Sequence, residues 1–315
     1  MIINIILLAL GFIVLIKGAD FFVDGASGIA ANFKVSKMLI GLTIVAFGTS
    51  APEFAVSIKS LLAGSGDIVL GNVIGSNILN ILLILGFSAL FHALSVKNNT
   101  VKKELPITLM ISAAFATLLS DNLFDHSVPN SFTRGDGIVL ILFFGVFLYY
   151  LIKMTRNKTE EEDEKPIRMR KAVLFTTVGI IGIILGSHFV VESAIWVAKA
   201  LGVTERMISL TIIALGTSLP ELVTSVMATR KGEYDIAIGN VVGSNIFNIG
   251  VVIGVPVAIF GSIGTVAFSY IDLLVMMVAA ILLFMFSFND YKISKKEGII
   301  FLILFVTYYS YVVLG

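Results

Sequence analysis

The sequence has no cysteine, one tryptophan and only three histidines among its 315 residues. The absence of cysteine excludes disulfides and metal sites built on thiolates. Charged residues make up 14% of the chain, whereas a soluble domain carries roughly a quarter. The net charge of +1 says nothing useful about partners, and we expect no nucleic-acid partner.

Long apolar runs take the place of the missing charge. Hydrophobic residues make up 57% of the chain, and the mean hydropathy is +1.00. Unalternating runs of about 20 residues are long enough to cross a bilayer as helices and do not fit a β-barrel. We therefore expect an all-α polytopic membrane protein with ten transmembrane helices, near residues 2–31, 38–63, 67–93, 104–120, 136–153, 172–199, 207–229, 235–260, 270–288 and 298–314.

Positive charge is distributed unevenly among the loops. The loops after odd-numbered spans hold 17 of the 22 lysines and arginines. Because such loops stay in the cytoplasm, both termini are expected outside the cell and the linker 155–171 inside. The protein is thus predicted to be a multi-pass protein of the cell membrane. The acidic run within the linker is interpreted as a solvated spacer.

The chain contains an internal repeat. A shift of 168 residues aligns Gly18–Asn80 with Gly186–Asn248 without a gap, and 28 of the 63 pairs are identical. We expect a first repeat over 1–154 and a second over 172–315, with five spans in each. An odd number of spans gives the two halves opposite orientations, and transporters built in this way bind substrate near the midplane, at broken helices.

The motif "GTSAPE" at 48–53 returns as "GTSLPE" at 216–221. Proline lacks an amide hydrogen and crowds the carbonyl four residues earlier, so Pro52 and Pro220 should release the carbonyls of Gly48 and Gly216. Ser50 and Glu53 are three residues apart, on one face of a helix. The same spacing joins Ser218 to Glu221.

A second repeated motif reads "GNVIGSNILN" at 71–80 and "GNVVGSNIFN" at 239–248. Ser76 and Asn80 share one helical face, as do Ser244 and Asn248. Together the motifs offer carboxylates, amides, hydroxyls and carbonyls, which are oxygen ligands preferred by hard cations such as calcium and sodium.

The two glutamates require compensation. Unpaired carboxylates in lipid are very costly, and an intramembrane acid is by default a functional site. One calcium ion cancels their combined charge of −2, and so do two sodium ions, which makes competitive exchange natural. Most isolated charges elsewhere, Lys59 for example, are interpreted as ordinary interface residues.

These paired motifs resemble the two alpha repeats of the cation/calcium antiporter superfamily, and the chain looks like a prokaryotic sodium/calcium exchanger over nearly its whole length. The resemblance implies alternating access, with sodium and calcium occupying one buried site in turn. Carried onto matching positions, it implies a set of metal ligands: Glu53, Glu221, Asn80, Asn248, Ser50, Ser218, Ser76, Ser244, Thr49, Thr217, Ala46 and Ala214.

One position departs from some relatives, which carry aspartate where this chain has Asn248. The asparagine argues against potassium co-transport. Proton/calcium relatives usually lack the "GTS" and "GSN" elements, so sodium coupling is favoured and a proton-coupled calcium antiporter is the nearest alternative.

Two other classes of function are weaker alternatives. An intramembrane hydrolase using Glu53 and Glu221 as an acid/base pair would need a nucleophile with its base, which the motifs do not supply. A passive cation channel would leak, whereas an exchanger couples the two fluxes. We expect a monomeric transporter, not an enzyme, with no cofactor and with calcium and sodium as its transported ligands.

Overall fold

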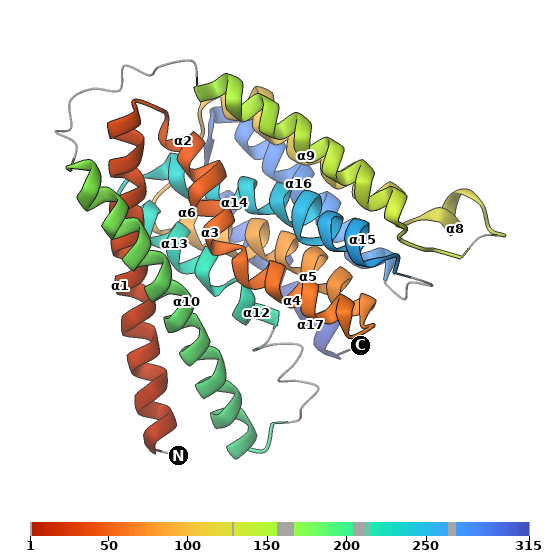
Figure 1. The fold of residues 1–315 in the computed structure, drawn as a ribbon, viewed down its shortest axis with the longest axis horizontal. Helices are drawn as coiled ribbons and strands as arrows, with labels where there is room; N and C mark the ends of the chain where they lie inside the picture. Colours follow the sequence, from red (N-terminus) through yellow and green to blue (C-terminus); the bar gives the residue numbers. More distant parts are fainter. Residues whose placement is uncertain are drawn as a thin grey trace.

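The computed structural model describes residues 2–127, 129–155, 167–203, 212, 214–263 and 269–314, and it is almost entirely helical (Figure 1). Within these residues, seven helices are long and apolar enough to cross a membrane, and an eighth span is obtained if a bent pair is counted as one. The prediction of a helical polytopic membrane protein is therefore confirmed at this level.

Several helices contain π-helical stretches, which are labelled η. The elements of the first half are α1 (Ile2–Phe33), α2 (Lys37–Ile40), η1 (Gly41–Val45), α3 (Ala46–Thr49), α4 (Ala51–Leu62), α5 (Gly66–Ile78), η2 (Leu79–Leu85), α6 (Gly86–Phe91), β1 (Leu94–Ser95), η3 (Thr100–Glu104), α7 (Leu105–Leu118), α8 (Asp121–Phe124) and α9 (Arg134–Thr155). Those of the second half are α10 (Met169–Ala200), α12 (Ala214–Thr217), α13 (Leu219–Arg230), α14 (Tyr234–Phe247), η5 (Asn248–Ile253), α15 (Gly254–Phe260), α16 (Tyr270–Asp290), β2 (Lys292–Ile293) and α17 (Lys295–Leu314).

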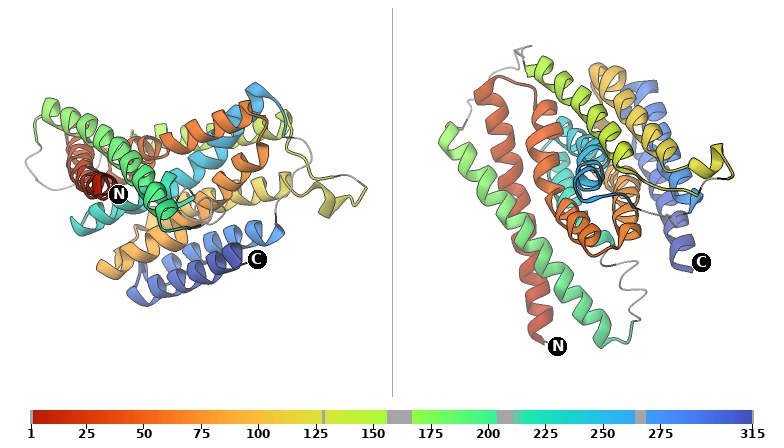
Figure 2. Two further views of the ribbon diagram at one scale, coloured as in Figure 1. Left: turned by 90° about the horizontal axis from the view of Figure 1, so that it is seen from below. Right: turned by 45° about the vertical axis from the view of Figure 1, so that its right-hand side comes forward.

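The helices α1 and α10 lie side by side at one edge of the molecule (Figures 1 and 2). Glycines allow their backbones to approach closely. A Cβ atom added at Gly25 would lie 2.4 Å from the backbone nitrogen of Thr176, and one at Gly186 would lie 2.5 Å from that of Leu15. Larger residues at these positions would push the two helices apart.

The continuous elements α5–η2–α6 and α14–η5–α15 form the interior. In their most apolar 18-residue stretches, 72% of the residues are buried, whereas the corresponding share in α1 and in α10 is 28%. The backbone of α14 meets that of η1, because a Cβ atom at Gly239 would lie 3.0 Å from the Cα atom of Gly41. This packing brings the second repeated motif against the first half of the chain.

The turns that precede these inner elements have the same geometry in both halves. Gly64 follows α4 with a φ angle of 74°, and its repeat counterpart Gly232 follows α13 with a φ angle of 77°. Positive φ angles suit glycine, which has no Cβ atom. The two strands, β1 and β2, join the halves by antiparallel pairing, with Leu94 opposite Ile293 and Ser95 opposite Lys292.

Candidate ion-binding site

Both helices that carry a glutamate are interrupted at the serine of the motif. Ser50 separates α3 from α4 with φ and ψ angles of −82° and 6°, and Ser218 separates α12 from α13 with angles of −89° and 6°. The two parts of the first helix are bent by 45°. Pro52 and Pro220 lie in the first turn after each break, where the missing amide hydrogen costs nothing.

The break releases a main-chain oxygen in the second half. The carbonyl of Gly216 accepts a hydrogen bond from Ser187 Oγ of α10, at 3.3 Å. This contact agrees with the release of that carbonyl expected from the proline. In the first half, the carbonyl of Ala46 accepts from the amide of Ser50 at 3.0 Å, and Ser244 Oγ lies 3.5 Å from it.

The serine of each broken helix hydrogen-bonds to the glutamate of the other. Ser50 Oγ donates to Glu221 Oε1 at 2.9 Å, and Ser218 Oγ donates to Glu53 Oε1 at 3.2 Å. All four side chains are buried, and each glutamate is only 1% exposed. The two repeats thus form one site.

The serines of the second motif join the same cluster. Ser244 Oγ lies 2.9 Å from Ser50 Oγ, and Ser76 Oγ lies 3.3 Å from Ser218 Oγ. We refer to these hydroxyls and the neighbouring acids and amides as the central polar cluster: Ser50, Glu53, Ser76, Asn80, Ser218, Glu221, Ser244 and Asn248.

Four asparagines link α5–η2 to α14–η5. Asn80 Nδ2 donates to Asn245 Oδ1 at 2.9 Å, and Asn248 Nδ2 donates to Asn77 Oδ1 at 3.2 Å. Asn77 and Asn245 also donate to each other's main-chain carbonyls, at 3.4 and 3.5 Å. These bonds fix which end of each amide donates, so Asn80 and Asn248 keep their side-chain oxygens free.

Free oxygen atoms are the main feature of the cluster. Among the described residues, nine buried side-chain oxygens have no hydrogen-bond partner, and they include Glu53 Oε2, Glu221 Oε2, Asn80 Oδ1 and Asn248 Oδ1. Buried polar atoms are normally satisfied, so four unpartnered oxygens on repeat-related residues require an explanation. A cation bound between them would satisfy all four.

The remaining predicted ligands lie around the breaks. Thr49 is buried at the end of α3 and donates from Oγ1 to Asn240 Oδ1 at 3.0 Å. Thr217 ends α12 and Ala214 begins it, as Ala46 begins α3. The threonine hydroxyl of the first half is therefore already engaged, whereas main-chain oxygens at these positions border the breaks.

The sequence interpretation missed six polar residues that support the cluster. Asn72 Nδ2 donates to the carbonyl of Glu53 and to Ser57 Oγ, both at 3.1 Å. Their repeat counterparts behave alike, because Asn240 Nδ2 lies 3.4 Å from the carbonyl of Glu221 and 2.9 Å from Ser225 Oγ. With Asn77 and Asn245, these residues are identical between the repeats, and that identity was the available signal.

The chemistry of the cluster suits a hard cation. Its two carboxylates and its amide and hydroxyl groups are all oxygen donors. Within the described residues, no group of three or more histidine, cysteine, aspartate or glutamate side chains could hold a metal ion. Neutral oxygens would therefore have to complete the coordination shell of a bound ion, which suits calcium and sodium better than zinc.

Comparison with known proteins agrees with this chemistry. The chain matches the family described as "Sodium/calcium exchanger protein" over residues 3–153 and 171–314. It is 36% identical to the inner membrane protein YrbG of Escherichia coli, covering 93% of this chain and 90% of that protein. It is 32% identical to the sodium/calcium exchanger MaX1 of Methanosarcina acetivorans, covering 97% of each.

Solved structures show the same similarity. The chain superposes on a structure of the sodium-calcium exchanger NCX_Mj with a TM-score of 0.84 and 32% sequence identity, covering 98% of this chain and 97% of the other. The family match spans nearly the whole chain, and both MaX1 and NCX_Mj are named as sodium/calcium exchangers. The chain therefore belongs to the sodium/calcium exchanger protein family.

Proposed function

We propose that this antiporter exchanges calcium for sodium by alternating access at the central polar cluster. The observation that supports the proposal best is the set of four unpartnered buried oxygens, on Glu53, Glu221, Asn80 and Asn248. The carboxylates lie on opposite repeats and are held by serines of the partner repeat. A bound cation replaces the hydrogen bonds that these oxygens lack.

Charge balance explains why calcium and sodium would compete for the same site. Two ionised glutamates carry a charge of −2, which one calcium ion or two sodium ions neutralise. When either ion set is bound, the neutral site can be closed off from water, and the protein can change the side from which the site is accessible. The empty site carries two charges, which makes this change costly. This difference couples the two fluxes.

The proposed ligands are side-chain oxygens of Glu53, Glu221, Asn80, Asn248, Ser50, Ser218, Ser76 and Ser244, with further oxygens from Thr49, Thr217, Ala46 and Ala214. The hydroxyl oxygens of Ser50 and Ser218 would direct their lone pairs toward the ion, while the hydroxyl hydrogens remain hydrogen-bonded to the glutamates. In this way the same hydrogen bonds position the carboxylates and the additional oxygen ligands.

The proposed topology has ten spans in two inverted repeats, over 1–154 and 172–315, with the cytoplasmic linker 155–171 between them. Residues 207–211 and 213 of the seventh span and residues 156–166 of the linker lie outside the described residues. The excess of lysine and arginine in the loops after odd-numbered spans supports termini outside the cell. A monomer suffices, because both carboxylates come from one chain.

A flux experiment on the purified protein in proteoliposomes tests the coupling ion. Radioactive calcium uptake is measured with an outward sodium gradient, with an outward proton gradient, or with neither, at matched membrane potential. Uptake that requires the sodium gradient supports the proposal. Uptake driven equally well by the proton gradient without sodium would instead favour proton coupling.

The same vesicles distinguish exchange from the other classes of function. Calcium loaded into the vesicles should leave only when sodium or calcium is present outside, because an exchanger must bind an ion outside before its site can face the inside again. Calcium loss into a medium without either ion would indicate a channel.

A further inference from the structure

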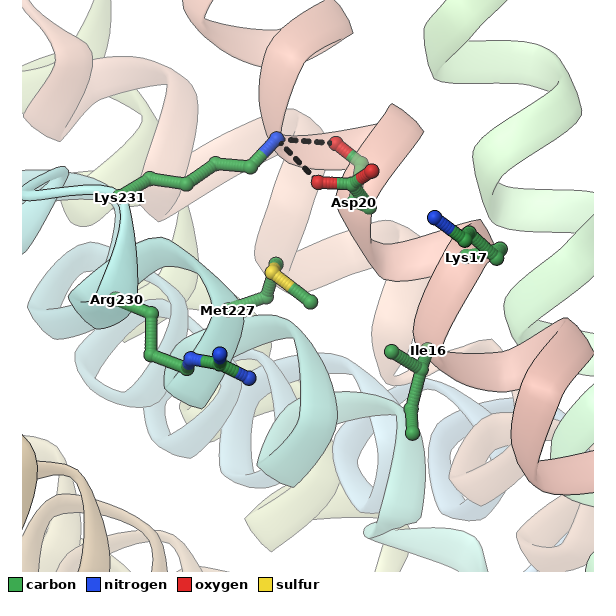
Figure 3. Close-up of a pocket in the computed structure, with 6 residues that line it drawn as sticks. All are labelled: Ile16, Lys17, Asp20, Met227, Arg230 and Lys231. Carbon is green, nitrogen blue, oxygen red and sulfur yellow. Dashed lines mark hydrogen bonds and ion pairs between the residues drawn. The ribbon is translucent and has the colours of Figure 1, made fainter.

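A second polar site lies outside the central polar cluster, between α1 and the end of α13 (Figure 3). It is a pocket with a volume of about 290 Å³, lined by Ile16, Lys17, Asp20, Met227, Arg230 and Lys231. We refer to it as the basic pocket. It shares no residue with the proposed cation site, and three cationic side chains against one carboxylate give its lining the opposite charge.

Lys231 is the fixed member of the basic pocket. Its ammonium group contacts Asp20 Oδ1 at 2.7 Å, Asp24 Oδ1 at 2.5 Å and the carbonyl of Asp20 at 2.8 Å. An ammonium group has three hydrogens, so these three acceptors use its donors. Lys231 therefore ties α13 to α1 and forms the wall of the pocket.

Lys17 and Arg230 have donors to spare. In the part of the chain that the structure describes, neither makes an ion pair or a hydrogen bond, and both are exposed. Figure 3 shows them on opposite sides of the pocket, one on each helix. The guanidinium group of Arg230 offers five N–H donors in a planar fork that matches phosphate oxygens.

An exposed apolar strip of α1 lies next to the charged residues of the pocket, and of its members Ile16 also lines the pocket. Ile13, Ile16 and Lys17 share one face of α1, since they are spaced by three and four residues. Ile13 is 57% exposed and Ile16 is 43% exposed, on a helix long and apolar enough to cross the membrane. An amphipathic ligand would place its phosphate in the pocket and an acyl chain along these isoleucines.

The repeat-related positions in the other half of the chain, which the structure also describes, do not form a second basic pocket. Under the 168-residue shift, Lys17 corresponds to Leu185, Arg230 to Leu62 and Lys231 to Ala63, whereas Met227 corresponds to Lys59. The pocket therefore has three cations where the repeat-related positions have one, on the side where the positively charged loops lie. Basic pockets between transmembrane helices on the cytoplasmic side bind anionic lipid headgroups.

We propose that the basic pocket binds the phosphate headgroup of an anionic phospholipid. Lys17 and Arg230 bind the phosphate, Lys231 maintains the distance between the helices, and Ile13 and Ile16 contact an acyl chain. The lipid would bridge α1 and α13, which belong to different halves of the chain.

Mass spectrometry of the intact purified protein tests the proposal in mixed micelles that contain phosphatidylglycerol or phosphatidylcholine with the same acyl chains. The wild type should retain phosphatidylglycerol in preference to phosphatidylcholine. Each interfacial charge adds about 1 kcal/mol, so Lys17→Gln and Arg230→Gln should each weaken retention roughly fivefold and the double variant roughly 25-fold. Lys17→Arg, which keeps the charge, should retain phosphatidylglycerol as well as the wild type does.

The matched control is Lys59→Gln, which removes a lysine at the repeat-related position and should leave retention unchanged. Elution as a single species in size-exclusion chromatography verifies that each variant is folded, and the single variants give the answer if the double variant aggregates. Equal retention of the two lipids, or equal retention by wild type and single variants, would overturn the proposal.

Free inorganic phosphate distinguishes the two sources of the anion. If millimolar phosphate displaces phosphatidylglycerol from the wild type, the pocket is a soluble-anion site and the lipid assignment fails. Because lipid retention is measured without calcium or sodium transport, the outcome is independent of the proposed exchange.

Discussion

The outer pair of helices, α1 and α10, and the inner pair, α5–η2 and α14–η5, come from the same duplication but differ in what they bury. The outer helices contact each other through glycines and expose most of their surface. The inner pair carries the amides and hydroxyls and buries 72% of its most apolar stretches. All four pass as membrane spans by hydropathy, so apolarity alone does not distinguish them.

The difference shows how polar groups are kept in a membrane protein. Asn77, Asn80, Asn245 and Asn248 are almost fully buried, and they hydrogen-bond across the interface between the repeats. Lipid cannot satisfy such groups, so they require an element covered by other helices. The outer helices need only shape complementarity. Substitutions in the inner region should therefore change ion binding, and those in the outer pair should change stability and rate.

The largest effect is expected at the glutamates of the central polar cluster. Removing one partner of a buried charge set costs about 3–5 kcal/mol, so Glu53→Gln or Glu221→Gln should reduce calcium exchange a hundredfold or more. Calcium uptake into proteoliposomes measures this effect. Glu104→Gln is the matched control, because Glu104 is also fully buried but lies outside the cluster. Near-normal exchange in either test variant would show that the substituted glutamate is not a ligand of the site.

Protons should compete with calcium for the same carboxylates. Each proton released on binding weakens apparent calcium affinity by roughly tenfold per pH unit at acidic pH. Calcium uptake measured between acidic and neutral pH should therefore fall with pH, and excess calcium should restore it. Inhibition that calcium cannot relieve would locate the proton effect elsewhere in the molecule.

A large side chain in the outer pair should affect stability without affecting the site. In Gly25→Leu, the new side chain meets backbone atoms of α10, and overpacking of this kind costs about 1–3 kcal/mol. Thermal unfolding in detergent should occur at a lower temperature, whereas the calcium dissociation constant should remain near that of the wild type. Gly145→Leu is the control, because a Cβ atom at Gly145 would meet nothing within 4 Å apart from its chain neighbours and the backbone of its own helix.

The smallest effect is expected from adding charge at the amides. Asn248→Asp and Asn80→Asp should tighten calcium binding several-fold at alkaline pH, with little gain at acidic pH, where the new carboxyl is neutral. Exchange should become slower, because the ion leaves less readily. Calorimetric titration at two pH values measures the affinity, and unchanged binding in both variants would make these asparagines packing residues.

Much of the central polar cluster could be predicted from the sequence, because identical residues in two repeats mark it, whereas ion binding by these residues stays a prediction. Ser50, Glu53, Ser76 and Asn80 and their counterparts all lie in the central polar cluster. Spacing did not predict that Ser50 would hydrogen-bond to Glu221 rather than to the glutamate on its own helix. Spacing describes one helix, whereas this partnership depends on how the two broken helices pack against each other.

Other features had no local signal. The pairing of β1 with β2 joins residues almost 200 positions apart, and no short motif specifies it. The positions of the π-helical stretches were also missed, because their residues keep an apolar pattern that suits an α-helix equally well.

Each π-helical stretch rotates the part of the inner helix that follows it about the helix axis, relative to the part that precedes it. The stretch η2 begins at Leu79, immediately before Asn80, and its repeat counterpart η5 begins at Asn248. A π turn contains about one residue more than an α turn, and one residue of an α-helix corresponds to roughly 100° of rotation. Deleting one residue between positions 81 and 85 would leave Ser76 in place but would turn Phe87 and Phe91 away from their exposed positions and bring Ala89 out of the core. The additional residue of the π turn thus allows one helix to face the central polar cluster over its first part and to expose phenylalanines over its last.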